Sequence, residues 1–447
     1  MHPPEADFTH PTGTPKMYEF MNKRLRLIRD SLKDKYVCAS CFRDYAICEF
    51  INSHLKWPTC TYCGRTSSQL ISASFSDVLH FIMEGVTFEW IASTPEVEWE
   101  AEHYGWHGGR DGWLGSDSMI QSVLPELRTA KGELLKDIVA YIAREWRPRR
   151  QYDPEPEDFF SYRWDEFANA VKYQTRYVYY RVNTDWQKDI NNRNRSSRFR
   201  IRPSHVIEEV LDNISDLDIT QTISPGTIIW RARMHDATVF LSTPEELGPP
   251  SFEEALASTR MSPAGIPVFY GSFERETTIA ETLKPEGGRK PSRVITVGRW
   301  ETLQEFRALN LAEIPATPSL FDAKLRKLRP TVSFLESFSE EISQPILKDG
   351  REHIEYVPTQ IFTEYIKHVY KDREGNKVDG ILYRSAIREN GINCVLFITK
   401  KDCVNYVESM EPGKTESKQK MLLETFERIP KVEADLFLPK QDTRRYY

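Results

Sequence analysis

The chain has 447 residues, of which 40% are hydrophobic, 12% aromatic and 28% charged, and its formal net charge is -6. This composition excludes an intrinsically disordered protein, and the length suggests two or three folded domains. The mildly acidic balance argues against a chain that coats a polyanion. No apolar run approaches the roughly 18 residues that a membrane span needs. Residues 1–16 lack the basic-then-apolar order of a secretory signal, so we expect a cytoplasmic protein that does not enter a membrane.

The N-terminal residues 1–34 are expected to form a polar tail that ends in an amphipathic helix over 17–34. A small cysteine module over residues 35–72 follows. Four of the seven cysteines form two Cys-x2-Cys pairs: Cys38, Cys41, Cys60 and Cys63. This spacing predicts a closed, structural zinc site, with Gly64 at the positive φ that a zinc knuckle often needs. Four free thiols, or a site in which His54 replaces one ligand, remain as alternatives.

Residues 73–185 are expected to be mainly helical and are similar to the helical domains called HEPN. Helical periodicity runs over 74–91, 133–146 and 164–182, interrupted by a Gly- and Trp-rich loop at 102–115. Residues 186–215 are expected to form a basic linker, which leaves contact with nucleic acid open. A motif of HEPN ribonucleases falls here, from Arg200 to His205, but Pro203 disrupts the helix that would present both side chains.

Residues 216–410 mix short strands and helices without a regular alternation, which indicates an α+β domain. Strands are expected at 227–234, 268–273, 293–300, 379–385 and 394–399, and helices at 275–284, 319–346 and 358–370. The last segment, 411–447, reads as a charged tail with one helical pattern over 418–429. A glycine pair followed by Arg289 and Lys290 lacks the spacing of a phosphate-binding loop and is expected to be a solvated turn.

Four motifs of the second half follow one another in a distinctive order. They are Trp230-Arg231-Ala232-Arg233 on the first strand, the turn from Arg260 to Gly265 that leads to Tyr270, Glu281 within a helix, and the segment from Asp379 through Tyr383 to Ser385. The ordered set resembles the RES family, named for an Arg, a Glu and a Ser, over residues 222–408. The resemblance implies an α+β fold like that of ADP-ribosyltransferases, and an enzyme whose substrate is NAD⁺.

The resemblance implies a site made of Arg231, Tyr270, Glu281 and Ser385, supported by Arg260. Cleavage of NAD⁺ releases neutral nicotinamide and builds an oxocarbenium cation on the ribose, which a carboxylate stabilises. Arg231 is expected to bind the pyrophosphate, Tyr270 to pack on the nicotinamide or its ribose, and Glu281 to bind the ribose hydroxyls. Ser385 is expected to orient Glu281 or the ribose.

Two further residues are second choices for the site. Arg233 shares a strand face with Arg231, and Tyr383 shares one with Ser385. Taken singly, the site residues also fit ordinary structural roles. These roles are a surface ion-pair partner for Arg231, a core residue for Tyr270, a helix-face carboxylate for Glu281 and a turn residue for Ser385.

Members of the RES family are mostly bacterial toxins that destroy NAD⁺ and are held by a separate antitoxin. Some relatives move ADP-ribose onto a protein instead. This chain departs from the compact toxins in its Arg260-Met261-Ser262-Pro263 turn, in a longer stretch over 300–356, and in its N-terminal half. We therefore expect an NAD⁺-cleaving toxin or defence effector, restrained by an antitoxin or by its own N-terminal half. A transferase acting on a protein or nucleic acid, and an inactive zinc-containing regulatory protein, are the alternatives; a homo-oligomer is left open.

Overall fold

The computed structural model describes residues 32–92, 114–115, 118, 132–142, 145–148, 159–181, 203–283, 293–343, 350–405 and 419–438. The chain forms two compact units. The first comprises Met1–Phe159 together with Thr317–Pro330, and the second comprises Phe160–Ala316 together with Thr331–Tyr447. Most of the helix expected at 17–34, most of the basic linker with Arg200, and the turn at Arg289 and Lys290 lie outside the described residues. Within the described part of the chain, no helix combines the length and apolarity that crossing a bilayer requires.

The N-terminal unit is built on one long helix, α3 (Phe75–Glu89), whose apolar face is buried at Val78, Leu79, Ile82 and Val86. Ser74 occupies the N-cap position of α3. The other described elements of this unit are β1 (Tyr36–Cys38), η1 (Ala39–Cys41), α2 (Tyr45–Ser53), β2 (Ser72–Ser74), β3 (Trp90–Ala92), β4 (Leu114–Gly115), α6 (Glu133–Ile142) and β5 (Glu145–Pro148). Strands β1 and β2 pair antiparallel, and β3, β5 and β4 form a second small sheet. The region expected to be helical therefore also contains strands.

A segment from the second half of the sequence completes the core of the N-terminal unit. Leu320 and Phe321 of the Thr317–Pro330 segment are fully buried in the same apolar cluster as α3. A side chain at Gly85 of α3 would meet the Phe321 ring at 2.5 Å, so only glycine allows this approach. Arg329 and Glu89 form a buried ion pair at 3.3 Å. The helix expected over 319–346 is thus shorter than predicted: α12 runs from Arg329 to Ser343.

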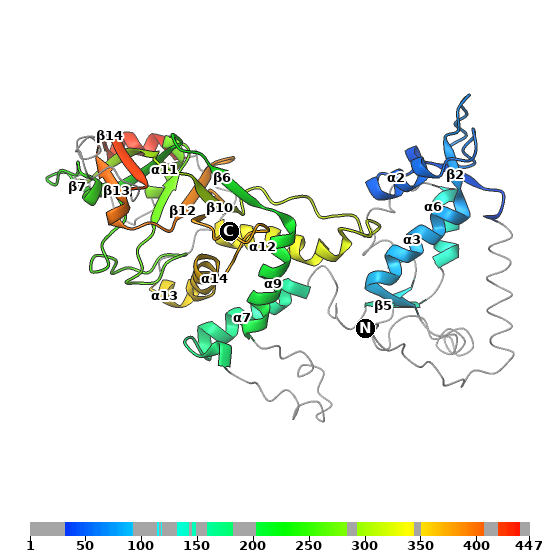
Figure 1. The fold of residues 1–447 in the computed structure, drawn as a ribbon, viewed down its shortest axis with the longest axis horizontal. Helices are drawn as coiled ribbons and strands as arrows, with labels where there is room; N and C mark the ends of the chain where they lie inside the picture. The colour runs from blue at the N-terminus through cyan, green and yellow to red at the C-terminus, as the bar shows by residue number, and fades with distance from the viewer. Residues whose placement is uncertain are drawn as a thin grey trace. The chain divides into compact units, whose positions relative to one another are not determined.

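The second unit is organised around a nine-stranded mixed sheet in the order β13-β14-β9-β7-β8-β12-β11-β10-β6. Figure 1 labels several of these strands, among them β7, β12 and β14. The strands are β6 (Thr220–Ile223), β7 (Ile228–Asp236), β8 (Phe269–Ser272), β9 (Arg293–Thr302), β10 (Phe306–Asn310), β11 (Gly380–Arg384), β12 (Ile392–Leu396), β13 (Cys403–Asn405) and β14 (Met421–Pro430). Helices and 3-10 turns are α7 (Phe159–Tyr173), η4 (Tyr179–Arg181), α9 (Pro203–Leu217), α10 (Pro244–Leu247), α11 (Arg275–Thr282), η6 (Arg326–Leu328, in the first unit), α13 (Glu352–Glu355), α14 (Val357–His368), η7 (Lys400–Asp402), α16 (Lys431–Ala434) and η8 (Asp435–Phe437). The expected mixture of helix and sheet is confirmed.

Side-chain alternation divides this sheet into two faces. On one face, Ile279 within α11 and Leu283, the residue that caps its C-terminus, pack with Trp230 and Ala232 of β7. On the other face, Ile229 packs with Phe269, Trp300 and Leu247. We call these the α11 face and the α10 face. Between β7 and β8 the ladder is reduced to one pair, Trp230 with Ser272.

Two expectations about the chain outside the central strands are wrong. The pattern over 418–429 forms β14 instead of a helix, because pairing with β9 from one end of the strand to the other overrides the local pattern. A register shift between Leu423 and Thr425 breaks the alternation that would have marked a strand. The linker expected at 186–215 ends in helix α9 (Pro203–Leu217), whose buried residues recur at helical spacing: Ile207, Val210, Leu211 and Ile214.

Candidate functional site

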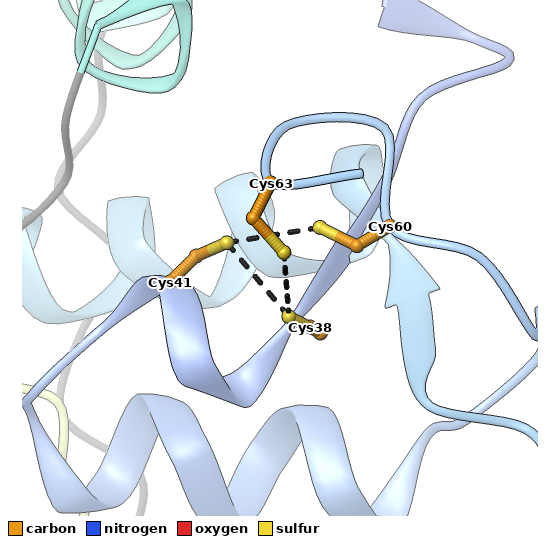
Figure 2. A group of neighbouring side chains, drawn as sticks. All are labelled: Cys38, Cys41, Cys60 and Cys63. Atoms are coloured by element: carbon orange, nitrogen blue, oxygen red, sulfur yellow. Dashed lines mark hydrogen bonds between the residues drawn. The ribbon is translucent and has the colours of Figure 1, made fainter. Parts of the chain in front are cut away.

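The four paired cysteines converge in the N-terminal unit. Figure 2 shows their sulfurs turned toward a common centre. The Sγ atoms of Cys38 and Cys41 lie 3.8 Å apart, those of Cys38 and Cys63 3.6 Å, and those of Cys41 and Cys60 3.7 Å. Zn–S bonds of about 2.3 Å in a tetrahedron would set adjacent sulfurs about 3.8 Å apart. The donor set and its spacing therefore fit a tetrahedral metal ion.

Local backbone conformation explains how the cysteines meet. Cys38 is the N-cap of the single turn η1 and Cys41 is its last residue. Gly64 has φ +71°, and its N–H donates to the carbonyl of Cys60. Donation from the Cys41 thiol and from nearby backbone N–H groups lowers the pKa of Cys60 to about 4, which favours a thiolate. His54 is not part of the cluster, whose grouped ligand atoms are the four cysteine sulfurs, and its Nδ1 instead lies 2.8 Å from the Phe50 carbonyl.

A second centre lies on the α11 face of the large sheet, around the carboxylate of Glu281 on α11. Ser385, just after β11, donates its hydroxyl to Glu281 Oε1 at 2.6 Å. The Ser385 Oγ in turn accepts the backbone N–H groups of Ile387 at 3.2 Å and Arg388 at 3.1 Å, which fixes the hydroxyl rotor. The structure therefore brings together the expected pair of Glu281 and Ser385.

Asn393 of β12 is a contact of Glu281 that the sequence reading did not include. Its Nδ2 donates to the same Oε1 of Glu281 at 3.0 Å, and its Oδ1 accepts the Ser272 hydroxyl at 2.5 Å. Asn393 and Ser272 are almost fully buried, with exposed fractions of only 3% and 2%. The sequence signal that could have identified Asn393 is an amide within an apolar strand, between Ile392 and Cys394, because a buried polar side chain needs a hydrogen-bond partner.

Tyr270 and Tyr383 lie on the same face as Glu281. Tyr383 is directly opposite Asn393 across the β11–β12 ladder, and burial raises its pKa well above the ordinary value, with further contributions from Tyr270 and Glu281. The hydroxyl of Tyr270 is 2.7 Å from the Thr259 hydroxyl and accepts the N–H of Met261 at 3.1 Å. The tyrosine is thus held by the turn that carries Arg260.

Arg260 supplies a guanidinium near this tyrosine pair. It lies over the ring of Tyr356 at 5.8 Å and donates to the carbonyl of Glu341 at 2.7 Å. Burial lowers its pKa, whereas Tyr356 and Tyr383 oppose that effect. Helix α14 fixes the turn that carries Arg260. Thr359 donates to the Arg260 carbonyl at 2.6 Å, and Gln360 donates to the Thr259 carbonyl at 2.7 Å.

Arg231 and Arg233 share a strand face, as alternation predicts, but it is the α10 face. Arg231 donates to the Leu247 carbonyl at 3.0 Å and to the Tyr270 carbonyl at 2.6 Å, and it lies over the Phe269 ring at 5.1 Å. Arg233 donates to the Gly248 carbonyl at 2.7 Å. Burial, and then Arg233, lower the pKa of Arg231 to about 9. Arg231 therefore links β8 to α10 by hydrogen bonds, on the face of the sheet opposite Glu281.

A cavity of about 580 Å³ adjoins Ser385. One face of α12 forms part of its wall, with Glu336, Ser339, Glu340 and Ser343, and the ends of β10 and β11 form the rest. Burial, and then Glu340, raise the pKa of Glu336. The cavity is within the size range of small-molecule sites and carries acidic groups beside its apolar wall.

Comparison with protein families gives two matches, which together cover more than half of the chain. Residues 54–185 match HEPN/RES N-terminal domain 1, and residues 228–416 match the RES domain. No curated protein and no solved structure matches the chain. The second match contains the Glu281–Ser385 centre, and the first begins within the cysteine module.

Proposed function

Because the chain belongs to the RES-domain proteins and carries the HEPN/RES N-terminal region of their longer form, we propose that it cleaves NAD⁺ at the bond between nicotinamide and ribose. The observation that carries this proposal is the carboxylate of Glu281. Two donors, Ser385 and Asn393, engage its Oε1, and no described residue donates to Oε2. One oxygen of an oriented carboxylate is therefore available to ribose hydroxyls and to a developing cation.

The reaction needs little acid–base chemistry at the leaving group. The C–N bond to the pyridinium breaks with its electron pair going to nitrogen, so nicotinamide leaves as a neutral molecule. The ribose becomes an oxocarbenium cation, which the negative charge of Glu281 stabilises. Water then bonds to the anomeric carbon and releases a proton, giving ADP-ribose. Tyr270 and Tyr383 would pack against the ribose on the α11 face.

The cavity beside Ser385 suits the nicotinamide end of the substrate better than the pyrophosphate. Glu336 and Glu340 outnumber the single cation of its lining, Arg384, whose Nε donates to the Ala312 carbonyl. This balance would disfavour phosphate oxygens, whereas the nicotinamide ring of NAD⁺ carries a positive charge. Arg260 is the guanidinium that lies near both tyrosines, and we assign the pyrophosphate to it in place of Arg231. Depletion of NAD⁺ by this site would make the chain a toxin or defence effector.

The assay that tests this function uses the full chain and NAD⁺ labelled in its adenylate half, with and without a cell extract. Free nicotinamide with free labelled ADP-ribose is the expected result. Label attached to protein or nucleic acid would instead indicate a transferase. The absence of both products would overturn the proposal and favour a binding or regulatory protein.

Substitution of the two arginines is expected to separate their roles. Arg260→Ala should raise the KM for NAD⁺ about tenfold or more, because it removes a charge-assisted contact with the pyrophosphate, and should lower the Tm less than Arg231→Ala does, because only the Glu341 carbonyl loses a donor among the contacts described. Arg231→Ala should instead lower the Tm, since the Leu247 and Tyr270 carbonyls lose their donor at roughly 1–3 kcal/mol each. Steady-state kinetics and thermal unfolding measure both. An Arg231→Ala protein with a raised KM and an unchanged Tm would reverse the assignment.

We propose that the cysteine cluster holds a structural zinc ion. Cys60→Ser is expected to abolish stoichiometric zinc and to destabilise the N-terminal unit by on the order of 5 kcal/mol or more, because zinc affinity is part of the folding free energy of such modules. Elemental analysis and thermal unfolding measure the two effects. Cys48→Ser is the matched control: Cys48 lies outside the cluster and contacts backbone carbonyls. Wild-type protein purified without any bound metal would contradict the assignment.

A further inference from the structure

We propose that Asn393 is a positioning residue for the reaction, which fixes the Glu281 carboxylate so that one oxygen is held and the other is presented to the substrate. This inference rests on the proposed NAD⁺ cleavage. It extends the site to a residue on a different strand from those of the Arg-Glu-Ser pattern. It also gives Ser272 a role, because its hydroxyl donates to Oδ1 of Asn393 and helps to hold the amide in place.

The geometry requires a definite orientation of the amide. Asn393 lies opposite Ser272 on β8 and opposite Tyr383 on β11 in the two ladders that flank β12. The hydroxyl of Ser272 donates to Oδ1, so the two hydrogens of Nδ2 are left for the other side, where Glu281 accepts one of them. Reversal of the amide would place its carbonyl oxygen against the Glu281 carboxylate, which can only accept, whereas the Ser272 hydroxyl can donate or accept. The burial of both residues excludes water as a substitute partner.

The chemistry explains why a neutral amide suits this position. A carboxylate that stabilises an oxocarbenium cation must keep its negative charge and its direction. Donation from Asn393 and Ser385 to one oxygen fixes the plane of the carboxylate. A lysine or arginine here would neutralise the charge, and an aspartate would repel it. The amide orients Glu281 without either effect.

The first test variant is Asn393→Ala in the full chain. Nicotinamide release is expected to fall about 10- to 100-fold in kcat, with the KM for NAD⁺ changed less than about threefold. The acid limb of the pH–rate profile should move to higher pH. Loss of a donor to the ionised carboxylate favours its protonated form, so activity is lost at a less acidic pH.

Two further variants keep the proposal open to contradiction if Asn393→Ala folds poorly. Asn393→Asp has nearly the same shape, but its carboxylate would lie against that of Glu281, so the acid limb should move further in the same direction. Ser272→Ala should give a smaller shift of the same sign, because the amide loses its orienting partner. The matched control is Cys394→Ala on the same strand, whose buried side chain packs on the opposite face.

The outcomes separate this inference from the function on which it rests. The role is supported if the wild type cleaves NAD⁺ and the acid limb moves in Asn393→Ala and Asn393→Asp but not in Cys394→Ala. If the wild type cleaves NAD⁺ but neither Asn393 variant moves the acid limb, the role is overturned and the proposed function stands. The same holds if Cys394→Ala moves the acid limb equally. Failure of the wild-type chain to cleave NAD⁺ overturns both.

Discussion

Glu281→Gln is expected to lower nicotinamide release from NAD⁺ by about 10²- to 10³-fold, the usual effect of removing one group that stabilises transition-state charge. The amide oxygen of the glutamine can still accept from Ser385 and Asn393. Its NH₂ group then occupies the position of the available carboxylate oxygen. The variant therefore presents a neutral donor where the wild type presents a charged acceptor. Single-turnover release of nicotinamide measures the effect.

The control for this prediction lies on the same helix. Glu276→Gln changes a carboxylate in the first turn of α11 that contacts Arg275 at 3.6 Å, and it should leave the rate unchanged. Thermal unfolding of both variants should match the wild type, since both substitutions preserve shape. Full activity in a folded Glu281→Gln protein would exclude Glu281 from the chemistry.

Truncation after residue 410 is expected to abolish folding of the second unit. It removes β14, which lies between β13 and β9 and pairs with β9 from Met421 opposite Thr302 to Pro430 opposite Val294. With β14 go its four buried hydrophobic side chains, Met421, Leu422, Leu423 and Ile429. At roughly 1.5–3 kcal/mol each, their burial is comparable with the whole stability of a typical domain. The exposed edge of β9 would favour aggregation.

A chain that ends at residue 438 is the matched control for this truncation. It keeps β14, α16 and η8, and should retain soluble yield and thermal unfolding close to those of the full chain. Size-exclusion chromatography and a thermal scan compare the three proteins. A chain ending at 410 that stays monomeric and unfolds at the wild-type temperature would show that β14 is dispensable.

The sequence by itself determined the features that depend on local spacing or on an ordered set of motifs. Two Cys-x2-Cys pairs predicted a cluster that the fold assembles, because each pair is fixed by one tight turn. The order of Arg231, Glu281 and Ser385 identified the family that the comparisons confirm. Alternation along β7 placed Arg233 beside Arg231. The contact between Glu281 and Ser385 followed from the family pattern, not from any local rule.

Only the tertiary structure decided the relations between distant segments. Alternation shows that Arg231 and Arg233 share a face, but which face is set by the packing of α10 and α11, so the separation of Arg231 from Glu281 could not be read locally. The role of Asn393 depends on the register that sets β12 beside both β8 and β11. Pairing with β9 made a strand of a helical pattern at β14. The burial of Phe321 against Gly85 joins residues far apart in the chain, because an apolar core is completed by whichever segment fits it.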